Sequence, residues 1–306
     1  MSLIINHNLM AMTAARNLSS AYGNLSTSVN RLSSGLRITT AADDAAGLAI
    51  RELMRADIAS LNQGVRNAND AISMIQTADG ALQVIDEKLI RMKELAEQAA
   101  TGTYTSDQRL IIDSEYQQMA SEITRIANAT DFNGIHLLNG NLSASGNSPS
   151  DWATSHIGTA LDSVGPLKVH FGSGNDSAED YYYIAIGNST ASALGVGNAA
   201  ATTSDGYSIS TQAAAQKALD ALNTAITSKD NIRANLGALQ NRLENTITNL
   251  TIQAENLQAA ESRISDVDVA TEMTNFVRNQ ILTQSAVAML SQANTLPQMA
   301  LQLMQG

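Results

Sequence analysis

The sequence predicts a mainly α-helical protein: a long antiparallel helical bundle with a small β-hairpin subdomain, plus N- and C-terminal helices paired as a coiled coil. Three observations lead to this prediction. Apolar residues recur with helical spacing over most of the 306-residue chain. Prolines occur only at Pro149, Pro166 and Pro297, so two long stretches contain no helix-breaking residue. Residues 167–187 instead alternate apolar and polar side chains in two short runs, as a pair of strands does.

Both ends carry an apolar repeat of seven residues, which is typical of a helix whose seam packs against another helix. The N-terminal repeat consists of Ile4, Ala11, Leu18, Leu25 and Leu32. The C-terminal repeat consists of Leu282, Met289, Leu296 and Leu303, and Ala286, Ala293 and Ala300 complete its stripe. We therefore expect residues 1–40 and 270–306 to form one coiled-coil domain.

The two ends are almost free of charge. From Met1 to Ala42 there is no acidic residue, and from Met273 to Gly306 the only charged side chain is Arg278. A helix that faces water normally carries many charges on its outer surface. We therefore expect both terminal helices to finish inside a protein assembly.

A simple estimate of folding free energy indicates when these ends fold. Burying four or five layers of large aliphatic side chains contributes on the order of 10 kcal/mol, at about 1.5–3 kcal/mol each. Ordering roughly 30 backbone residues costs about 1–2 kcal/mol per residue, and backbone hydrogen bonds recover only part of the difference. We expect the ends to be disordered in the monomer and to fold when neighbouring copies bury them.

The middle of the chain predicts the bundle. One helix is expected from about residue 43 to 100, after a likeness to a capping box at Thr40-Ala-Ala-Asp43. A second helix starts at Thr105-Ser106-Asp107-Gln108 and returns antiparallel to it. A third long helix is expected from residue 210 to about 264, with a break at 265–268. A further break or kink is expected at Pro297. The helical shell domain thus comprises residues 41–140 and 165–269, with the hairpin near 167–187, and residues 141–164 and 188–209 are predicted to be variable surface loops.

Composition excludes several classes of function. The net charge of −11 argues against a nucleic-acid or anionic-membrane surface. The chain has no cysteine, and His7, His136, His156 and His170 lack the spacing of a zinc protease motif. We expect no catalytic residue, no metal and no cofactor. The uncharged run 279–306 is too rich in amide and hydroxyl side chains to span a membrane, and the N-terminus does not resemble a signal peptide.

Five motifs resemble bacterial flagellin, in the order in which that family carries them. They are Arg31-Leu-Ser-Ser-Gly-Leu-Arg-Ile38, Asp43-Asp-Ala-Ala-Gly-Leu-Ala-Ile50, Asp131-Phe-Asn-Gly-Ile135, Gly237-Ala-Leu-Gln-Asn-Arg242 and Ala260-Glu-Ser-Arg-Ile264. The match covers about residues 1–140 and 165–306, so the chain is similar to a short flagellin without large outer domains.

The resemblance implies a structural subunit that polymerises into the extracellular flagellar filament and serves motility. Its terminal helices would form the inner tube and its long helices the surrounding shell. Implied partners are other copies of the chain, a flagellar export chaperone bound at the C-terminus, and the filament cap and hook-junction proteins. The implied route out of the cell is the flagellar type III apparatus. The alternatives are a hook–filament junction protein with flagellin-like ends and a plain coiled-coil dimer.

The resemblance also implies a surface for innate immune recognition by Toll-like receptor 5. The positions that match the family's receptor-binding residues are Arg91, Leu95 and Glu115. Arg91 and Leu95 are four apart and are expected on one helical face. The alternative reading is that these residues only make contacts between subunits.

Overall fold

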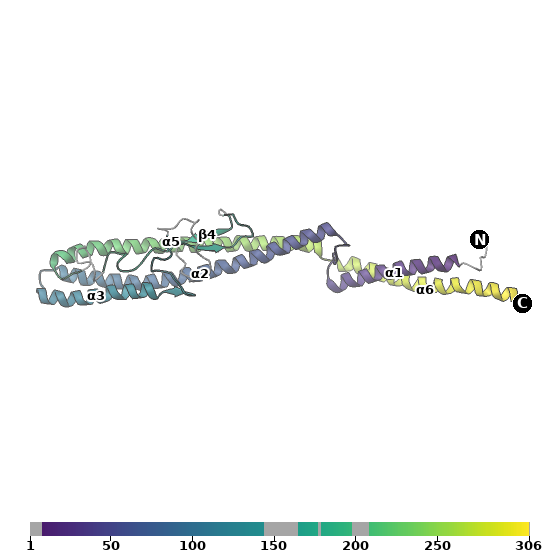
Figure 1. The fold of residues 1–306 in the computed structure, drawn as a ribbon, viewed down its shortest axis with the longest axis horizontal. Coiled ribbons are helices and arrows are strands. Elements are labelled where there is room, and N and C mark those ends of the chain that lie inside the picture. The colour runs from purple at the N-terminus through teal and green to yellow at the C-terminus, as the bar shows by residue number, and fades with distance from the viewer. Residues whose placement is uncertain (1–7, 144–164, 177–178, 198–207, 306) are drawn as a thin grey trace. The chain divides into compact units, whose positions relative to one another are not determined.

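The structure is a computed structural model, which describes residues 8–143, 165–176, 179–197 and 208–305. Its helices are α1 (Leu9–Ser34), α2 (Ala45–Ala100), α3 (Ser106–Ala129), α5 (Gln212–Ser265) and α6 (Val269–Gln305). Two antiparallel hairpins complete the fold: β1 (Asp131–Phe132) with β2 (Ile135–His136), and β3 (Leu167–His170) with β4 (Tyr181–Ile184) (Figure 1). The predicted mainly α-helical fold class is confirmed.

The chain divides into two compact units, and the division lies within α2 and α5. The terminal unit comprises residues 1–58 and 254–306, and the central unit comprises residues 59–253. The division expected from the sequence, at residues 40 and 270, stays a prediction about the functional domains.

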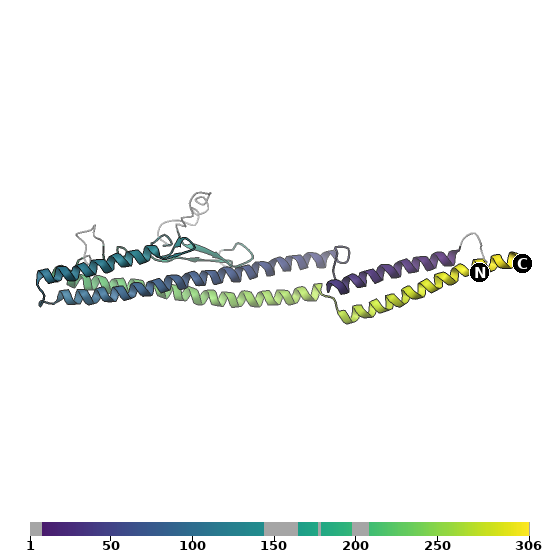
Figure 2. The ribbon, with the colours of Figure 1, turned by 90° about the horizontal axis from the view of Figure 1, so that it is seen from below.

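The central unit is built on three helices that lie side by side, α2, α3 and α5, as Figures 1 and 2 show. The apolar residues of α2 recur every three or four positions, so they form one stripe that faces the other two helices. Fully buried members of the core are Leu82, Ile85, Leu89 and Met92 from α2, Tyr116 and Ile123 from α3, and Ala218, Leu222 and Leu236 from α5. Burial of such side chains contributes about 1.5–3 kcal/mol each, which makes this core the main source of stability.

Ion pairs fix how α5 lies along α2. The buried Lys229 ammonium lies 2.5 Å from an Asp86 oxygen and 2.8 Å from one of Asp230. One turn further along α5, the Arg233 Nε donates to Asp79 at 2.7 Å. A buried ammonium without a partner is strongly destabilising, so an α5 shifted along α2 would be penalised.

The β3–β4 hairpin lies where the alternating sequence predicts a hairpin, and a close backbone approach anchors it to α2. A Cβ atom at Gly64 would overlap the carbonyl oxygen of Phe171, so only glycine fits there. Beside it, the Asn67 amide donates to the His170 carbonyl at 2.8 Å. On the other side, the Arg242 guanidinium lies 3.6 Å from the centre of the Tyr182 ring, which ties β4 to α5.

Two features of the central unit differ from expectation. The β1–β2 hairpin was not predicted, although its turn is Asn133-Gly134 with positive φ at both residues, the usual signal for a two-residue hairpin. Residues 188–197 begin a segment expected to be a surface loop, but Ala191, Leu194 and Val196 are buried in the core. A few apolar residues among Asn, Ser, Thr and Gly were too sparse to suggest burial.

The terminal unit is formed by α1 and α6, which run antiparallel (Figures 1 and 2). Contacts near both ends of the pair establish this direction: Asn8 bonds Ala293, whereas Arg31 lies 3.9 Å from Glu272. Gly35, at φ 73°, ends α1 as the sequence suggests. The pair of helices is thus closed by contacts far apart in sequence.

A joint connects the pair to the start of α2 and the end of α5. The chain segments cross as an antiparallel bridge between Leu36 and Asp266, and the Arg37 guanidinium donates to the Ile264 carbonyl at 2.5 Å. Asp43 closes the turn before α2. Hydrogen bonds from the backbone of Thr40, and then from the hydroxyl and backbone of Thr39, lower the pKa of Asp43 to about 2.

The expected end or kink at Pro297 is corrected in one respect: α6 continues through this residue to Gln305. Proline has no N–H, so the carbonyl four residues earlier loses its helical partner. That carbonyl belongs to Ala293, and the Asn8 amide donates to it at 2.8 Å. The Asn8 side-chain oxygen also accepts from the Ala11 N–H at 3.0 Å and caps α1. The Asn8 side chain therefore caps the start of α1 and also supplies the hydrogen bond that Pro297 cannot give in α6.

We expect Gly64→Ala to destabilise the central unit by about 1–3 kcal/mol, because the Phe171 carbonyl is backbone and cannot rotate away from the added methyl group. Thermal unfolding followed by circular dichroism measures the change, and hydrogen exchange at β3 locates it. Gly80→Ala is the matched control in the same helix. A Cβ there meets nothing within 4 Å, so a gain of up to about 1 kcal/mol is expected. Equal effects of the two substitutions would contradict the close approach.

Asn8→Ser keeps a capping oxygen but is too short to reach the Ala293 carbonyl. We expect it to weaken the α1–α6 pair by about 1 kcal/mol, the usual effect of leaving a carbonyl unpaired. Pro297→Ala restores the missing N–H, so the same Asn8→Ser change is expected to do less damage in that background. Hydrogen exchange at the amides of α1, measured in filaments grown from each of the four combinations, gives the coupling. If the effects of the two substitutions on the stability of the pair simply add, Asn8 does not compensate for the N–H that Pro297 lacks.

Candidate functional site

The α1 half of the terminal pair matches the predicted seam. Ala11, Leu18, Leu25 and Leu32 are all half-buried, and Ala21 and Ser28 between them are buried. These residues face α6, which is the element that packs along this stretch of α1 among the described residues of the terminal unit. Ile4 lies outside the described residues.

The α6 half differs from the predicted seam. Leu282 and Met289 are 51% and 61% exposed, whereas Thr283 and Ala293 are buried and Ala286 is half-buried. The stripe that faces α1 is therefore rotated by about one residue from the predicted one. The reason is that apolar residues occur on every side of α6, interspersed with amide and hydroxyl side chains, so the seven-residue repeat was one of several stripes of similar character. Leu296 and Leu303 lie in α6, but their side chains are outside the described part.

Large apolar side chains remain exposed around α6. They are Val269, Met273, Val277, Ile281, Leu282, Val287, Met289 and Met299. After Glu272, which is buried beside Arg31, the one charged residue is Arg278. Large apolar side chains on every side of a helix are normally buried, and among the described residues of one chain α1 alone packs along α6. The surface is thus incomplete without further protein.

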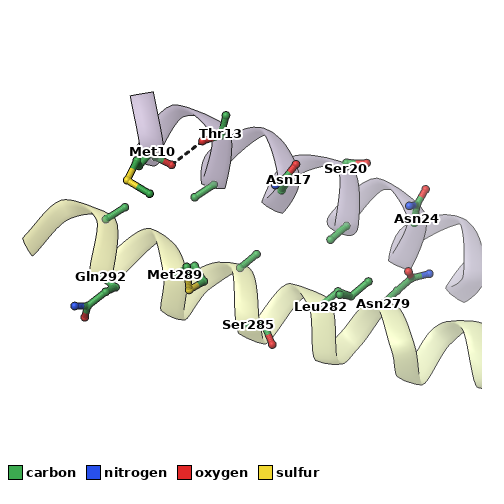
Figure 3. Close-up of a pocket in the computed structure, with 14 residues that line it drawn as sticks. Met10, Thr13, Asn17, Ser20, Asn24, Asn279, Leu282, Ser285, Met289 and Gln292 are labelled. Carbon is green, nitrogen blue, oxygen red and sulfur yellow. Dashed lines mark hydrogen bonds between the residues drawn. The ribbon is translucent and has the colours of Figure 1, made fainter. Parts of the chain in front are cut away.

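One flank of the pair is hollowed into a groove of about 570 Å³. Figure 3 shows its labelled residues on facing stretches of α1 and α6. Its lining has no charged side chain and consists of Met10, Thr13, Ala14, Asn17, Ser20, Ala21, Asn24, Asn279, Leu282, Ser285, Ala286, Met289, Gln292 and Ala293. The predicted assembly residues Leu282 and Met289 therefore lie at this groove, beside α1 but not under it.

The second predicted site lies in the central unit, where the structure brings two of its three residues together. The Arg91 guanidinium donates to one Glu115 oxygen from Nε at 3.1 Å and from Nη2 at 2.8 Å, and to Glu94 at 2.9 Å. These bonds, first to Glu94 and then to Glu115, raise the pKa of Arg91 above its usual range. Arg91 and Glu115 are 48% and 43% exposed at their side chains. The pair is thus a fixed, accessible charge pattern on α2 and α3.

Leu95 does not join this surface, because it is 1% exposed and packs in the core. It follows Arg91 by four residues, but it lies at the edge of the stripe that faces inward. Exposed apolar area beside the ion pair comes instead from Ile111, one turn before Glu115 on α3, which is 73% exposed. The sequence signal for Ile111 was its lack of fit to the apolar spacing of α3.

No other chemistry is apparent in the part of the chain that the structure describes. Within it, no group of three or more metal-ligating side chains comes together. No helix among these residues is long and apolar enough to cross a membrane. Of the histidines, His170 stacks on Tyr181 with ring centres 6.0 Å apart, while His7 and His156 lie outside the described ranges.

The chain is similar to known proteins over almost its whole length. Two family models match the chain: the bacterial flagellin N-terminal helical region over residues 5–143, and the bacterial flagellin C-terminal helical region over residues 219–304. A flagellin of Halalkalibacterium halodurans is 42% identical over 302 residues, covering 99% of this chain and 100% of the relative. The flagellar filament core protein flaB2 of Brachyspira hyodysenteriae is 41% identical over 303 residues, with the same coverage.

The crystal structure of Bacillus cereus flagellin is 30% identical, with a TM-score of 0.45, and covers 64% of this chain and 94% of its own. The whole-length relatives and the two family models lead to one conclusion: the chain belongs to the bacterial flagellin family.

Proposed function

We propose that the terminal helices α1 and α6 of this flagellin, a structural subunit of the flagellar filament, form the core of that filament. The observation that carries the proposal is α6, whose exposed apolar surface a single chain leaves uncovered. Neighbouring copies would cover it, and Ile4, Ala11, Leu18, Leu25, Leu32, Leu282, Met289, Leu296 and Leu303 are the residues that we assign to this assembly. The flagellin family is a family of structural proteins, and the proposed role is structural and not enzymatic.

The subunit would reach its place unfolded. The chain has no cysteine to cross-link in transit and few prolines, and its ends gain their partners only in the assembly. This supports export through the flagellar type III apparatus, with an export chaperone bound to the C-terminal helix. The partners at the two ends of the filament would be the cap protein and the hook-junction proteins. A role as hook–filament junction protein is less well supported, because the whole-length relatives are a flagellin and a filament core protein.

We further propose that Toll-like receptor 5 recognises the surface around Arg91 and Glu115. The ion pair holds both side chains in one geometry, and Ile111 adds exposed apolar area next to it. A fixed arginine beside apolar surface is typical of the residues that dominate binding energy at interfaces. Leu95 would act from the core, by holding α2 in position under Arg91.

Limited digestion with trypsin tests the assembly role. In purified monomer we expect cleavage after Arg16, Arg31 and Arg278, because the ends are unfolded, and protection of the same bonds in filaments grown from seeds. Lys229 and Arg233 are the internal control, since ion pairs on folded α5 hold them in both states. Terminal bonds that resist trypsin in the monomer would contradict the proposal. Electron microscopy of the seeded sample distinguishes long filaments from the persistent monomer of a junction protein.

Arg91→Ala is expected to reduce activation of Toll-like receptor 5 in reporter cells by about tenfold or more, the effect of losing a dominant interface arginine. Thermal unfolding of the monomer should change little, since exposed ion pairs contribute little to stability. Arg125→Ala is the matched control. Arg125 forms a similar exposed pair with Glu122 on α3, at 2.6 Å. Unchanged signalling by Arg91→Ala, or equal loss in both variants, would remove the assignment.

A further inference from the structure

The terminal pair has two unlike flanks. One flank holds the uncharged groove described above. At about 100° per residue along a helix, the opposite flank carries Tyr22 and Val29 from α1 and Val269, Met273 and Val277 from α6, which we call the flank ridge. All five side chains are large and 44–58% exposed. The first flank is hollowed by the groove, whereas the opposite flank carries a row of large exposed side chains.

The groove and the flank ridge are both uncharged. The floor of the groove is made by small residues, Ala14, Ala21, Ala286 and Ala293, and its walls by Met10, Leu282 and Met289. Val269, Met273 and Val277 follow one another by four residues and form a continuous row along α6. Rows of this spacing fit into grooves between helices. Neither surface carries a charge, whereas the chain has a net charge of −11.

We infer that the groove of one copy receives the flank ridge of a second copy of this chain. This inference rests on the proposed core assembly and specifies which faces meet. Because the groove and the ridge lie on different flanks, each copy uses one surface to accept a neighbour and the other to be accepted. Contacts of this unlike kind extend into open helical polymers, whereas contacts between identical faces close into dimers.

A basic or acidic partner is a poor fit for the groove, since burial of an unpaired charge in an uncharged lining is unfavourable. A second copy of the chain satisfies the chemistry without any further component. It also covers the exposed row on α6, which a ligand of the groove alone would leave in water.

Disulfide trapping in filaments tests the inference, because the chain has no cysteine of its own. Ridge variants Met273→Cys and Val277→Cys are each mixed with groove variants Ser20→Cys and Ser285→Cys, together with an excess of the unmodified chain so that filaments form. After mild oxidation, covalent dimers are measured on gels without reductant. A disulfide requires Cβ atoms within about 3.5–4.5 Å. We expect dimer in at least one ridge–groove mixture, and loss of that dimer when either variant is used alone.

Gly23→Cys is the matched control on α1. A Cβ at Gly23 meets nothing within 4 Å. By helical spacing the residue lies on the side of α1 opposite to α6, so it belongs to neither the groove nor the flank ridge. It should give no dimer with any partner. Dimer formed by a groove variant alone, equal yield with Gly23→Cys, or no dimer from any ridge–groove mixture in filaments seen by electron microscopy would overturn the inference. In the last case filaments still form and the proposed core assembly stands. If the unmodified chain forms no filaments, both fail.

Discussion

The terminal unit depends on the burial of α6. Apolar and uncharged polar side chains are mixed on every side of this helix, and among the described residues of one chain α1 covers a single stripe of it. The central unit does not share this constraint, because its apolar stripes on α2, α3 and α5 satisfy one another. One polypeptide thus combines a core complete in itself with a surface that, in the proposed assembly, copies of the chain would complete. That division of labour is what a subunit needs if it must stay soluble before assembly and be firmly held afterwards.

Polar groups give the terminal pair its register where apolar packing cannot. A helix whose apolar residues are spread over all of its sides can slide or rotate against its partner with little change in buried area. Specific bonds must therefore select one arrangement. Asn8 at one end bonds the Ala293 carbonyl, and Arg31 at the other lies between Asp43 and Glu272. The Lys229–Asp86 and Arg233–Asp79 pairs do the same for α5 against α2. In each unit apolar burial supplies the free energy and a few polar contacts specify the position.

Local signals in the sequence were sufficient for most elements. The helix start expected at Thr105–Gln108 is the start of α3, where a capping box joins two residues three apart by both of its hydrogen bonds. The apolar stripe on α2 could be predicted because the opposite face of that helix is polar. On α6 no such contrast exists, so the repeat at Leu282 and Met289 identified a helix but not its covered side. The Asn8 bond to Ala293 spans 285 residues, and no local pattern predicts which distant donor replaces the N–H that Pro297 lacks. Leu95 shows the same limit, because helical spacing relates it to Arg91 but tertiary packing decides that one side chain is buried.

The missing charge at the two ends is better understood as a requirement than as an accident of composition. A charged side chain on α1 or α6 would help the monomer in water, but it would have to be desolvated or paired at every repeat once copies surround the pair. Amide and hydroxyl side chains such as Asn17, Asn24 and Ser285 hydrogen-bond water before assembly and other amides after it. They therefore allow the same surface to be wet in one state and buried in the other. The price of that tolerance is weak specificity, and shape has to replace charge in deciding which neighbour fits. A groove floored with alanine and a row of valine and methionine on the far flank supply that shape.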